Sequence, residues 1–379
     1  MDEREAQLAL SLVPHVGPTA FGALLSHFGS ARQVLRASVR KLTAVHGIGP
    51  GVGEAIRAFP VERELGAVLK RLAQGRIRFL TWGDTEYPTR LRQISQPPPI
   101  LYLAGTLTPQ DTLAVAVVGT RHPSRYGQEV ASQLAGQLAL RGLTIVSGLA
   151  RGVDGAAHRG ALGVGGRTLA VLGSGVDVIY PPEHKALAVK VEAHGALLSE
   201  FPLGTKPLQG NFPQRNRVIS GLALGVVVVE ARAKSGALIT AHCALEQGRE
   251  VFAVPGPVTS ERSRGCHGLI QEGAKLTEDW EDVIAEIAPQ LEAAHDQPPA
   301  AVRPPAPDGH AGQILGLMEE EPVQIDQLIS TSGLGASVVA AALLELEMQG
   351  HIRQLEGKAF MKVPFAGKGK QRAKVARHR

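Results

Sequence analysis

Several glycine-rich loops in this sequence combine backbone amides, hydroxyl groups and arginines, the groups that proteins use to bind phosphate. A glycine lets the chain turn tightly and brings its amide close to a ligand. An arginine can donate two parallel hydrogen bonds to phosphate oxygens. The candidate phosphate-binding residues of these loops are Gly119, Thr120, Arg121, Ser147, Gly148, Arg151, Gly152, Ser235 and Gly236.

A further segment, residues 206–217, brings cations, amides and an aromatic ring together. No Asp or Glu occurs between Glu200 and Glu230. Single-stranded nucleic acid requires this combination, because its bases stack on rings and its phosphates attract cations. The alternative interpretation is that Phe212 is a core residue and that one of the two arginines braces the fold. The candidate residues here are Lys206, Asn211, Phe212, Arg215, Asn216 and Arg217.

Other polar residues near these loops have simpler interpretations. Asp154 falls at the expected start of a helix, so we interpret it as a helix cap rather than a general base. His158 has no identifiable partner and is predicted to be structural. Cys243 and Cys266 lack a metal-ligand spacing, and the sequence contains no Walker A lysine. We therefore expect no metal site, no bound cofactor and no catalytic residue.

The candidate residues need a framework that gathers their loops. Apolar runs at 115–118, 144–146, 169–172, 226–229 and 251–254 are too short for helices and alternate with helical patterns. Such alternation is typical of a mainly parallel, doubly wound α/β sheet. Because the carboxyl ends of parallel strands meet at one edge, the loops are expected to converge there.

The rest of the chain suggests flanking modules. Residues 45–56 match a helix–hairpin–helix turn, although such turns also serve as plain helix connectors. The proline-rich stretch 289–310 has too few aliphatic residues for a core. The predicted parts are an N-terminal helical domain (1–68), an extended Rossmann-like domain (69–288), a linker (289–310), a winged-helix module (311–363) and a basic tail (364–379).

Composition limits the possible environments. The 379 residues carry a net charge of +5, which favours a polyanionic partner. The sequence has no apolar stretch of membrane-spanning length, and its first residues lack a signal-peptide pattern. We expect no membrane partner and a cytoplasmic location.

The motifs resemble those of one known family. Their order and spacing are similar to the DNA-processing protein A (DprA/Smf) family. The resemblance implies an extended Rossmann domain that binds single-stranded DNA, forms homodimers and helps to load the RecA recombinase during natural transformation. It also implies that Arg121, Lys206, Phe212, Arg215 and Arg217 contact DNA. The matching segments are 118–121, 147–154, 212–222, 230–241 and 255–256.

Two rival functions fit parts of the sequence less well. A related Rossmann group hydrolyses nucleotide N-glycosidic bonds, but this alignment puts Cys243 where that chemistry needs a glutamate. A transcription factor would read DNA with the winged helix, yet the expected recognition helix, 335–347, has two acids and no Lys or Arg. Single-stranded DNA binding remains the preferred hypothesis, with the glycosidase-like enzyme as the alternative.

Overall fold

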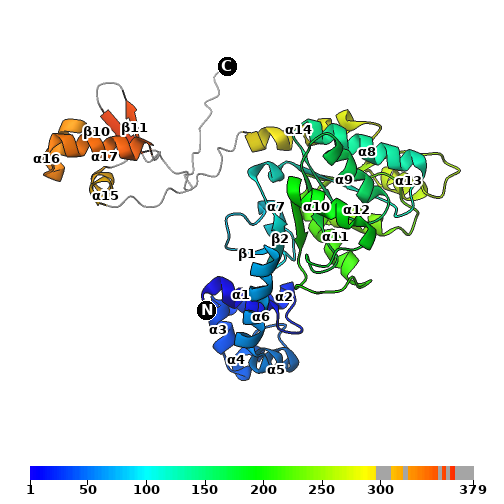
Figure 1. Cartoon of the computed structure of the whole chain (residues 1–379), viewed down its shortest axis with the longest axis horizontal. Coiled ribbons are helices and arrows are strands. Elements are labelled where there is room, and N and C mark those ends of the chain that lie inside the picture. The colour runs from blue at the N-terminus through cyan, green and yellow to red at the C-terminus, as the bar shows by residue number, and fades with distance from the viewer. Residues whose placement is uncertain (296–308, 319–322, 349–351, 356–358, 363–379) are drawn as a thin grey trace, which may run out of the picture. The chain divides into compact units, whose positions relative to one another are not determined.

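The computed structural model describes residues 1–295, 309–318, 323–348, 352–355 and 359–362 (Figure 1). These residues belong to two compact units, Met1–Asp296 and Gln297–Arg379, each of which is described by itself. No single helix in the described ranges is long and apolar enough to cross a membrane. One bent pair, Ile325–Ser332 with Ala336–Glu347, passes that test by length and composition.

The larger unit is built on a nine-stranded sheet with the order β1-β2-β6-β5-β4-β3-β7-β8-β9 (Figure 1). The strands from β6 to β9 are parallel, whereas β1 and β2 pair antiparallel. The winding direction reverses between β3 and β7, which confirms the predicted doubly wound sheet. The strands are β1 (Arg78–Thr81), β2 (Ile100–Gly105), β3 (Ala114–Val118), β4 (Thr144–Ser147), β5 (Thr168–Val171), β6 (Gly195–Ser199), β7 (Gly225–Val228), β8 (Glu250–Ala253) and β9 (Lys275–Leu276).

Helices cover both faces of this sheet, so the central strands are apolar on both sides. In β3, Ala116 and Val118 enter one core while Val115 and Val117 enter the other. Helices α8 and α9 approach so closely that a Cβ on Gly160 would overlap the backbone of the facing helix. The helices are α7 (Thr89–Arg92), α8 (Arg125–Leu140), α9 (Val153–Gly163), α10 (Lys185–His194), α11 (Asn211–Leu222), α12 (Gly236–Glu246), α13 (Arg264–Gln271) and α14 (Trp280–His295).

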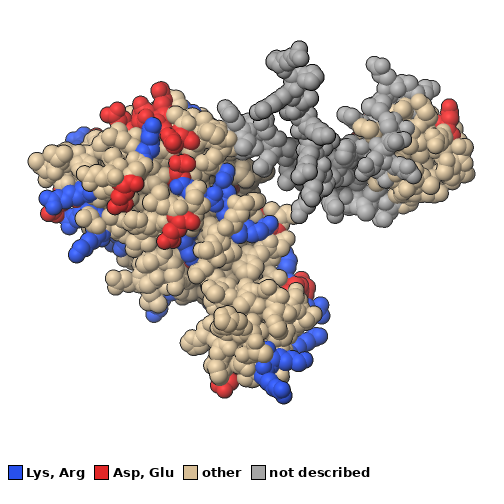
Figure 2. All heavy atoms as spheres, turned by 180° about the vertical axis from the view of Figure 1, so that it is seen from behind, with Lys and Arg blue, Asp and Glu red and all other residues tan. Residues whose placement is uncertain are grey.

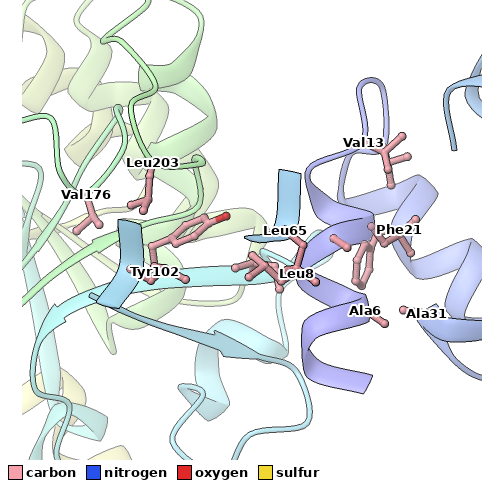
Figure 3. Close-up of a cluster of buried hydrophobic side chains, with 14 of the residues drawn as sticks. Ala6, Leu8, Val13, Phe21, Ala31, Leu65, Tyr102, Val176 and Leu203 are labelled. Atoms are coloured by element: carbon pink, nitrogen blue, oxygen red, sulfur yellow. The ribbon is translucent and has the colours of Figure 1, made fainter. Parts of the chain in front are cut away.

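The N-terminal helices form a lobe beside the sheet (Figures 1 and 2). The predicted boundary at residue 68 falls within a helix that continues to Gly75. Leu8 and Leu65 of the lobe share a core with Tyr102 of β2 (Figure 3). The lobe consists of α1 (Glu3–Ser11), α2 (Pro18–Phe28), α3 (Ala31–Arg36), α4 (Val39–Thr43), α5 (Pro50–Ala58) and α6 (Val61–Gly75).

The predicted start of the linker at residue 289 also falls within a helix. Helix α14 continues to His295 with Pro289 inside it. Val283 and Ile287 are buried and Leu291 packs against the same core, so this helix belongs to the sheet domain. The rest of the predicted linker is described only from 309 onward, and the predicted basic tail lies outside the described residues.

The second unit has the predicted winged-helix fold. Its strands form an antiparallel sheet in the order β10-β12-β11. Ile314, Leu328, Leu346 and Phe360 are buried in its own core. The predicted recognition helix corresponds to α17. The elements are α15 (Gly309–Leu317), β10 (Val323–Gln324), α16 (Ile325–Ser332), α17 (Ala336–Met348), β11 (Ile352–Leu355) and β12 (Ala359–Lys362).

Candidate nucleic-acid interface

A pocket opens where the carboxyl ends of β3, β4 and β5 meet the first turn of α11. The sequence placed its candidate loops at this sheet edge, and the structure brings four of the predicted residues, Arg121, Gly148, Arg151 and Phe212, into the pocket lining. The remaining lining residues follow β4 and β5 and were not among the predicted site residues. The full lining is Arg121, Gly148, Ala150, Arg151, Gly173, Ser174, Tyr180, Pro181 and Phe212.

Arginine and aromatic side chains lie against one another in this pocket. The guanidinium carbon of Arg121 is 4.9 Å from the centroid of the Phe212 ring, a cation–π distance. The Tyr180 ring is 6.0 Å from the Phe212 ring between centroids, with a tilt of 46°. A Cβ on Gly173 would lie 2.9 Å from the Phe212 ring, so this glycine makes room for the ring. Arg121 itself is exposed, and its charge faces solvent.

The loop after β3 is held by backbone bonds rather than left free. The amide of Thr120 donates to the carbonyl of Glu230 at 2.7 Å, and the Thr120 hydroxyl accepts from the amide of His122 at 3.2 Å. The Glu230 carboxylate accepts from the Ser124 amide and hydroxyl at 2.8 and 2.6 Å. The Thr120 amide is therefore engaged within the fold, whereas its hydroxyl, which accepts here, still has a hydrogen to donate to a phosphate.

Glycines in these loops meet neighbouring backbone. A Cβ on Gly119 would lie 3.0 Å from the Glu230 carbonyl oxygen, and Gly152 has a φ of +77°. A side chain at Gly152 would also overlap the backbone of Thr120 and Arg121. These two predicted site residues shape the loop that carries the arginine.

The structure contradicts the predicted phosphate-binding role of Ser147. Its side chain is fully buried, and its hydroxyl donates to the carbonyl of Val117 at 2.7 Å. It fastens β4 to β3 and cannot reach a ligand. Arg151 is exposed and pairs with Glu183, so a phosphate must compete with that carboxylate for it.

Asp154 does not cap its own helix, so the predicted cap is wrong. Gly152 occupies the N-cap position of α9 and makes no side-chain bond. The Asp154 carboxylate instead accepts from the amides of Gly148 at 3.1 Å and Ala150 at 3.4 Å. Burial raises the pKa of Asp154, while Arg215 and these amides oppose the rise. Asp154 therefore stabilises the loop after β4 by accepting hydrogen bonds from its backbone amides.

Arg215 contradicts its predicted role as a DNA contact. Its side chain is buried, with the residue only 4% exposed. The guanidinium donates to the carbonyl of Gly148 at 2.6 Å and also to that of Val171. Burial lowers the pKa of Arg215 to about 10, which the charge of Asp154 opposes. The arginine thus ties β5 and the loop after β4 together beneath the pocket.

Arg217 is also occupied. It forms an ion pair with Glu200 and donates to the carbonyl of Gln96. The side chain is 15% exposed, so its charge is largely neutralised and shielded. The expected direct contact between Arg217 and DNA is therefore corrected to a bond that holds α11 to the sheet.

The other predicted residues lie at the rim or outside the pocket. Lys206 is exposed on the segment before α11. The side-chain amide of Asn211 donates to the Gly173 carbonyl at 3.1 Å, which joins α11 to the loop after β5. Asn216 is buried and donates to the Gly236 carbonyl at 3.2 Å. Ser235 caps α12 by accepting from the Ala237 amide at 3.3 Å, so Asn216, Ser235 and Gly236 stabilise α11 and α12.

The comparisons with known proteins agree with this architecture. The model of the DNA recombination-mediator protein A family matches residues 78–288. A DprA winged-helix model matches residues 298–358, and a helix-hairpin-helix motif matches residues 7–68. Protein Smf of Synechocystis is 35% identical over 95% of this chain and 99% of its own length.

This chain belongs to the DprA/Smf family. Protein Smf of Escherichia coli is 43% identical over 72% of this chain and 75% of its own. Among DprA structures, that of Streptococcus pneumoniae has a TM-score of 0.68 and 35% identity, and covers 76% of this chain and 99% of its own. DprA of Helicobacter pylori has a TM-score of 0.51 and 29% identity, and covers 56% of this chain and 97% of its own.

A buried histidine lies within the DprA sheet domain. His158 is fully buried in α9, and its Nδ1 is 2.7 Å from the hydroxyl of Thr168. That hydroxyl donates its hydrogen to the carbonyl of Ile145, so it accepts from Nδ1–H, and Nε2 is the unprotonated nitrogen. Nε2 has no partner within the described residues. The structural role predicted for His158 agrees with this position.

This histidine predicts acid sensitivity. Burial lowers the pKa of His158 from 6.5 to about 3. Its contribution to stability is complete above the unfolded pKa and is lost as the pH falls toward 3. Going from about pH 7 to about pH 5 should cost about 2 kcal/mol through this residue alone. We expect urea unfolding at the two pH values to show a smaller loss in His158→Leu than in wild type; equal losses would contradict this.

Proposed function

We propose that this protein binds single-stranded DNA in the pocket formed by Arg121, Tyr180 and Phe212. The observation that carries the proposal is the stacking of an exposed guanidinium on an aromatic ring at a sheet edge surrounded by glycine loops. The arginine supplies charge for a phosphate and the rings supply faces for bases. The Helicobacter pylori relative is described as having a single-stranded DNA binding mode, which supports the same ligand here.

The pocket favours an unpaired base. A base that stacks on one of these rings at the rim of the pocket must leave its own duplex stack, which costs free energy for paired DNA and little for a single strand. Helix α17, which corresponds to the recognition helix of the winged module, contains no Lys or Arg. We therefore do not propose that this helix reads base sequence in a DNA groove.

We further propose that the protein is not a hydrolase. Two carboxylates near the pocket are engaged: Asp154 accepts from two backbone amides, and Glu183 pairs with Arg151. Cys243 lies within α12, where the glycosidase alignment required a carboxylate. Incubation of purified protein with AMP should yield no adenine, and turnover that disappears in Arg121→Ala would refute this.

At the level of the cell, we propose that a cytoplasmic homodimer receives incoming single strands and helps to load RecA on them during natural transformation. The name of the matching family model, a DNA recombination mediator, supports this proposal. Its tests are light scattering for the dimer and a RecA filament assay on strands bound by this protein. A monomer at working concentration, or filament formation unchanged by the protein, would count against it.

The first measurement is a salt series. We expect oligo-dT to bind more tightly than a duplex of equal length, and we expect the affinity to fall as salt rises. The physical reason is that the pocket adds base stacking to phosphate contacts. Fluorescence anisotropy with labelled oligonucleotides measures both affinities. Equal affinities across the series would mean that the rings do not stack on bases.

A further inference from the structure

We propose that Glu183 is an internal competitor for the DNA phosphate at Arg151. Its carboxylate holds the guanidinium in the free protein, leaves it when a single strand binds, and returns to it as the strand departs. This role rests on the proposed single-strand function of the pocket and adds a residue that sets how tightly the pocket holds its ligand. Glu183 was not among the site residues predicted from sequence. It lies in the short helical turn η2 (Pro182–His184), directly after the pocket residues Tyr180 and Pro181.

Glu183 and Arg151 meet at the edge of the pocket. Arg151 belongs to the loop after β4 and lines the pocket, and its Nε donates to a carboxylate oxygen of Glu183. The two side chains are 49% and 50% exposed, so water, salt and a ligand can all reach the pair. Exposed ion pairs of this kind are weak, because solvent screens them and both side chains lose freedom. The pair can therefore open when a stronger anionic partner arrives.

The Glu183 carboxylate resembles a phosphate in the way it binds a guanidinium. Both anions present charged oxygens to the N–H groups of an arginine. The hydrogen bond from Arg151 lowers the pKa of Glu183, so the carboxylate is charged at neutral pH. Because Arg151 cannot donate the same Nε–H fully to two anions, a phosphate that binds there must displace the carboxylate.

A second contact holds η2 in place independently of this pair. The Nδ1 atom of His184 is 2.9 Å from the carbonyl oxygen of Leu149, a fully buried residue of the loop after β4. A Cβ on Gly155 of α9 would lie 2.8 Å from the His184 ring, so the ring packs closely on that helix. His184 therefore fastens η2 to the loop after β4 whether the ion pair is open or closed. Loss of the Glu183 charge should leave the pocket in place.

The other arginine of the pocket lining is open from the start. Arg121 is exposed, and across the described ranges it forms no ion pair. A strand can thus place a phosphate on Arg121 and a base on Phe212 while the Arg151 pair is still closed. Because both arginines line one pocket, a neighbouring phosphate of the anchored strand then meets Arg151 at a high effective concentration. Anchoring comes first, and exchange of the carboxylate follows.

This exchange predicts a particular salt dependence. In the wild type, Arg151 has an anionic partner before and after binding, and the freed Glu183 carboxylate attracts a cation from solution. The contact therefore adds little to the net release of ions. Without the carboxylate, the same contact releases counterions from the strand, and the slope of log K against log salt steepens by about 0.7 for one single-strand phosphate. A residue with a purely structural role would not change that slope.

The test titrates the full chain with labelled oligo-dT across a salt series and measures dissociation after addition of unlabelled oligo-dT. In Glu183→Gln we expect the affinity at low salt to rise about two- to fivefold and the salt slope to steepen as described. Dissociation should slow by a similar factor, because no carboxylate competes for Arg151.

The matched control is Glu129→Gln, which also removes an exposed carboxylate from an arginine pair. Neither Glu129 nor its partner Arg125 lines the pocket. The control makes the same change in net charge, so it reports the effect of general charge on binding. It should change the affinity by less than about 1.5-fold.

The effect of Glu183 must also act through Arg151. In an Arg151→Gln background, which should itself bind more weakly, adding Glu183→Gln should raise the affinity no more than the control variant does. Unchanged or weaker binding by Glu183→Gln, an equal gain in Glu129→Gln, or a full gain without Arg151 would each overturn the competitor role while leaving the pocket function intact. Failure of the wild type to bind oligo-dT would instead refute the pocket function, and the competitor role with it.

Discussion

Replacement of Arg215 by methionine is expected to destabilise the protein by about 3–5 kcal/mol, because it leaves two buried carbonyls without a donor and removes a charge that favours the buried Asp154 carboxylate. These carbonyls belong to Gly148 and Val171, and both residues are buried. Single-stranded DNA binding should be lost as a consequence of the damaged loop. Urea unfolding measures the stability, and anisotropy with oligo-dT measures the binding.

The control is Arg232→Met, which removes the same charge from an exposed position. It should change the free energy of unfolding by less than about 0.5 kcal/mol. A double variant with Asp154→Asn should be less destabilised than the sum of its single variants, because the charges of Arg215 and Asp154 attract each other and each single change removes the same attraction. An Arg215→Met protein as stable as wild type, but unable to bind DNA, would restore the direct phosphate contact predicted from sequence.

Arg121→Glu is expected to weaken single-stranded DNA binding by about 2–4 kcal/mol while leaving the fold intact. This corresponds to an affinity loss of roughly 30- to 1,000-fold. The change removes an exposed cation from the face of Phe212 and places a carboxylate where a phosphate is expected. The residue is exposed, so no buried partner is abandoned. Oligo-dT titration and the unfolding temperature together separate the two effects.

Arg125→Glu is the matched control. It reverses a charge four positions away on a side chain that is 93% exposed and paired with Glu129. It should weaken binding far less than Arg121→Glu does, because Arg125 does not line the pocket and changes only the overall charge of the protein. Phe212→Ala should cost about 1–3 kcal/mol, while Phe212→Trp should retain most of the affinity, because both large rings stack. Equal losses of affinity in Arg121→Glu and Arg125→Glu would contradict a direct contact between Arg121 and DNA.

The sheet could be predicted because its apolar runs are short, regular and followed by glycines. The runs at 115–118 and 226–229 correspond to β3 and to β7 with the residue after it. The limits of the domains were harder to predict from sequence, since they depend on packing between distant segments. Residue 68 falls inside α6, which remains helical because Leu65 and Leu72 are buried in the core that also contains Tyr102. Pro289 resembled the start of a linker, yet it lies within a helix held by Val283 and Ile287.

The site was only partly accessible to sequence reasoning. The pairing of Arg121 with Phe212 follows from two segments meeting at one sheet edge, which topology predicts. Arg215 is buried against the carbonyls of Gly148 and Val171, which lie 67 and 44 positions away in the chain. No local sequence pattern predicts such a contact. Arg217 resembled an unpaired cation because its partner, Glu200, bounds the acid-free stretch from outside. Tyr180 was missed, although an aromatic residue before two prolines, close after a glycine loop, is a usable signal.

Helix α6 has a mechanical consequence. Because it runs without a break from the lobe towards β1, and because Leu8, Leu65 and Tyr102 share one core, the lobe and the sheet domain are packed as one body (Figure 3). A strand pulled from the pocket therefore transmits its load through the sheet to the lobe, rather than to a loose hinge between them.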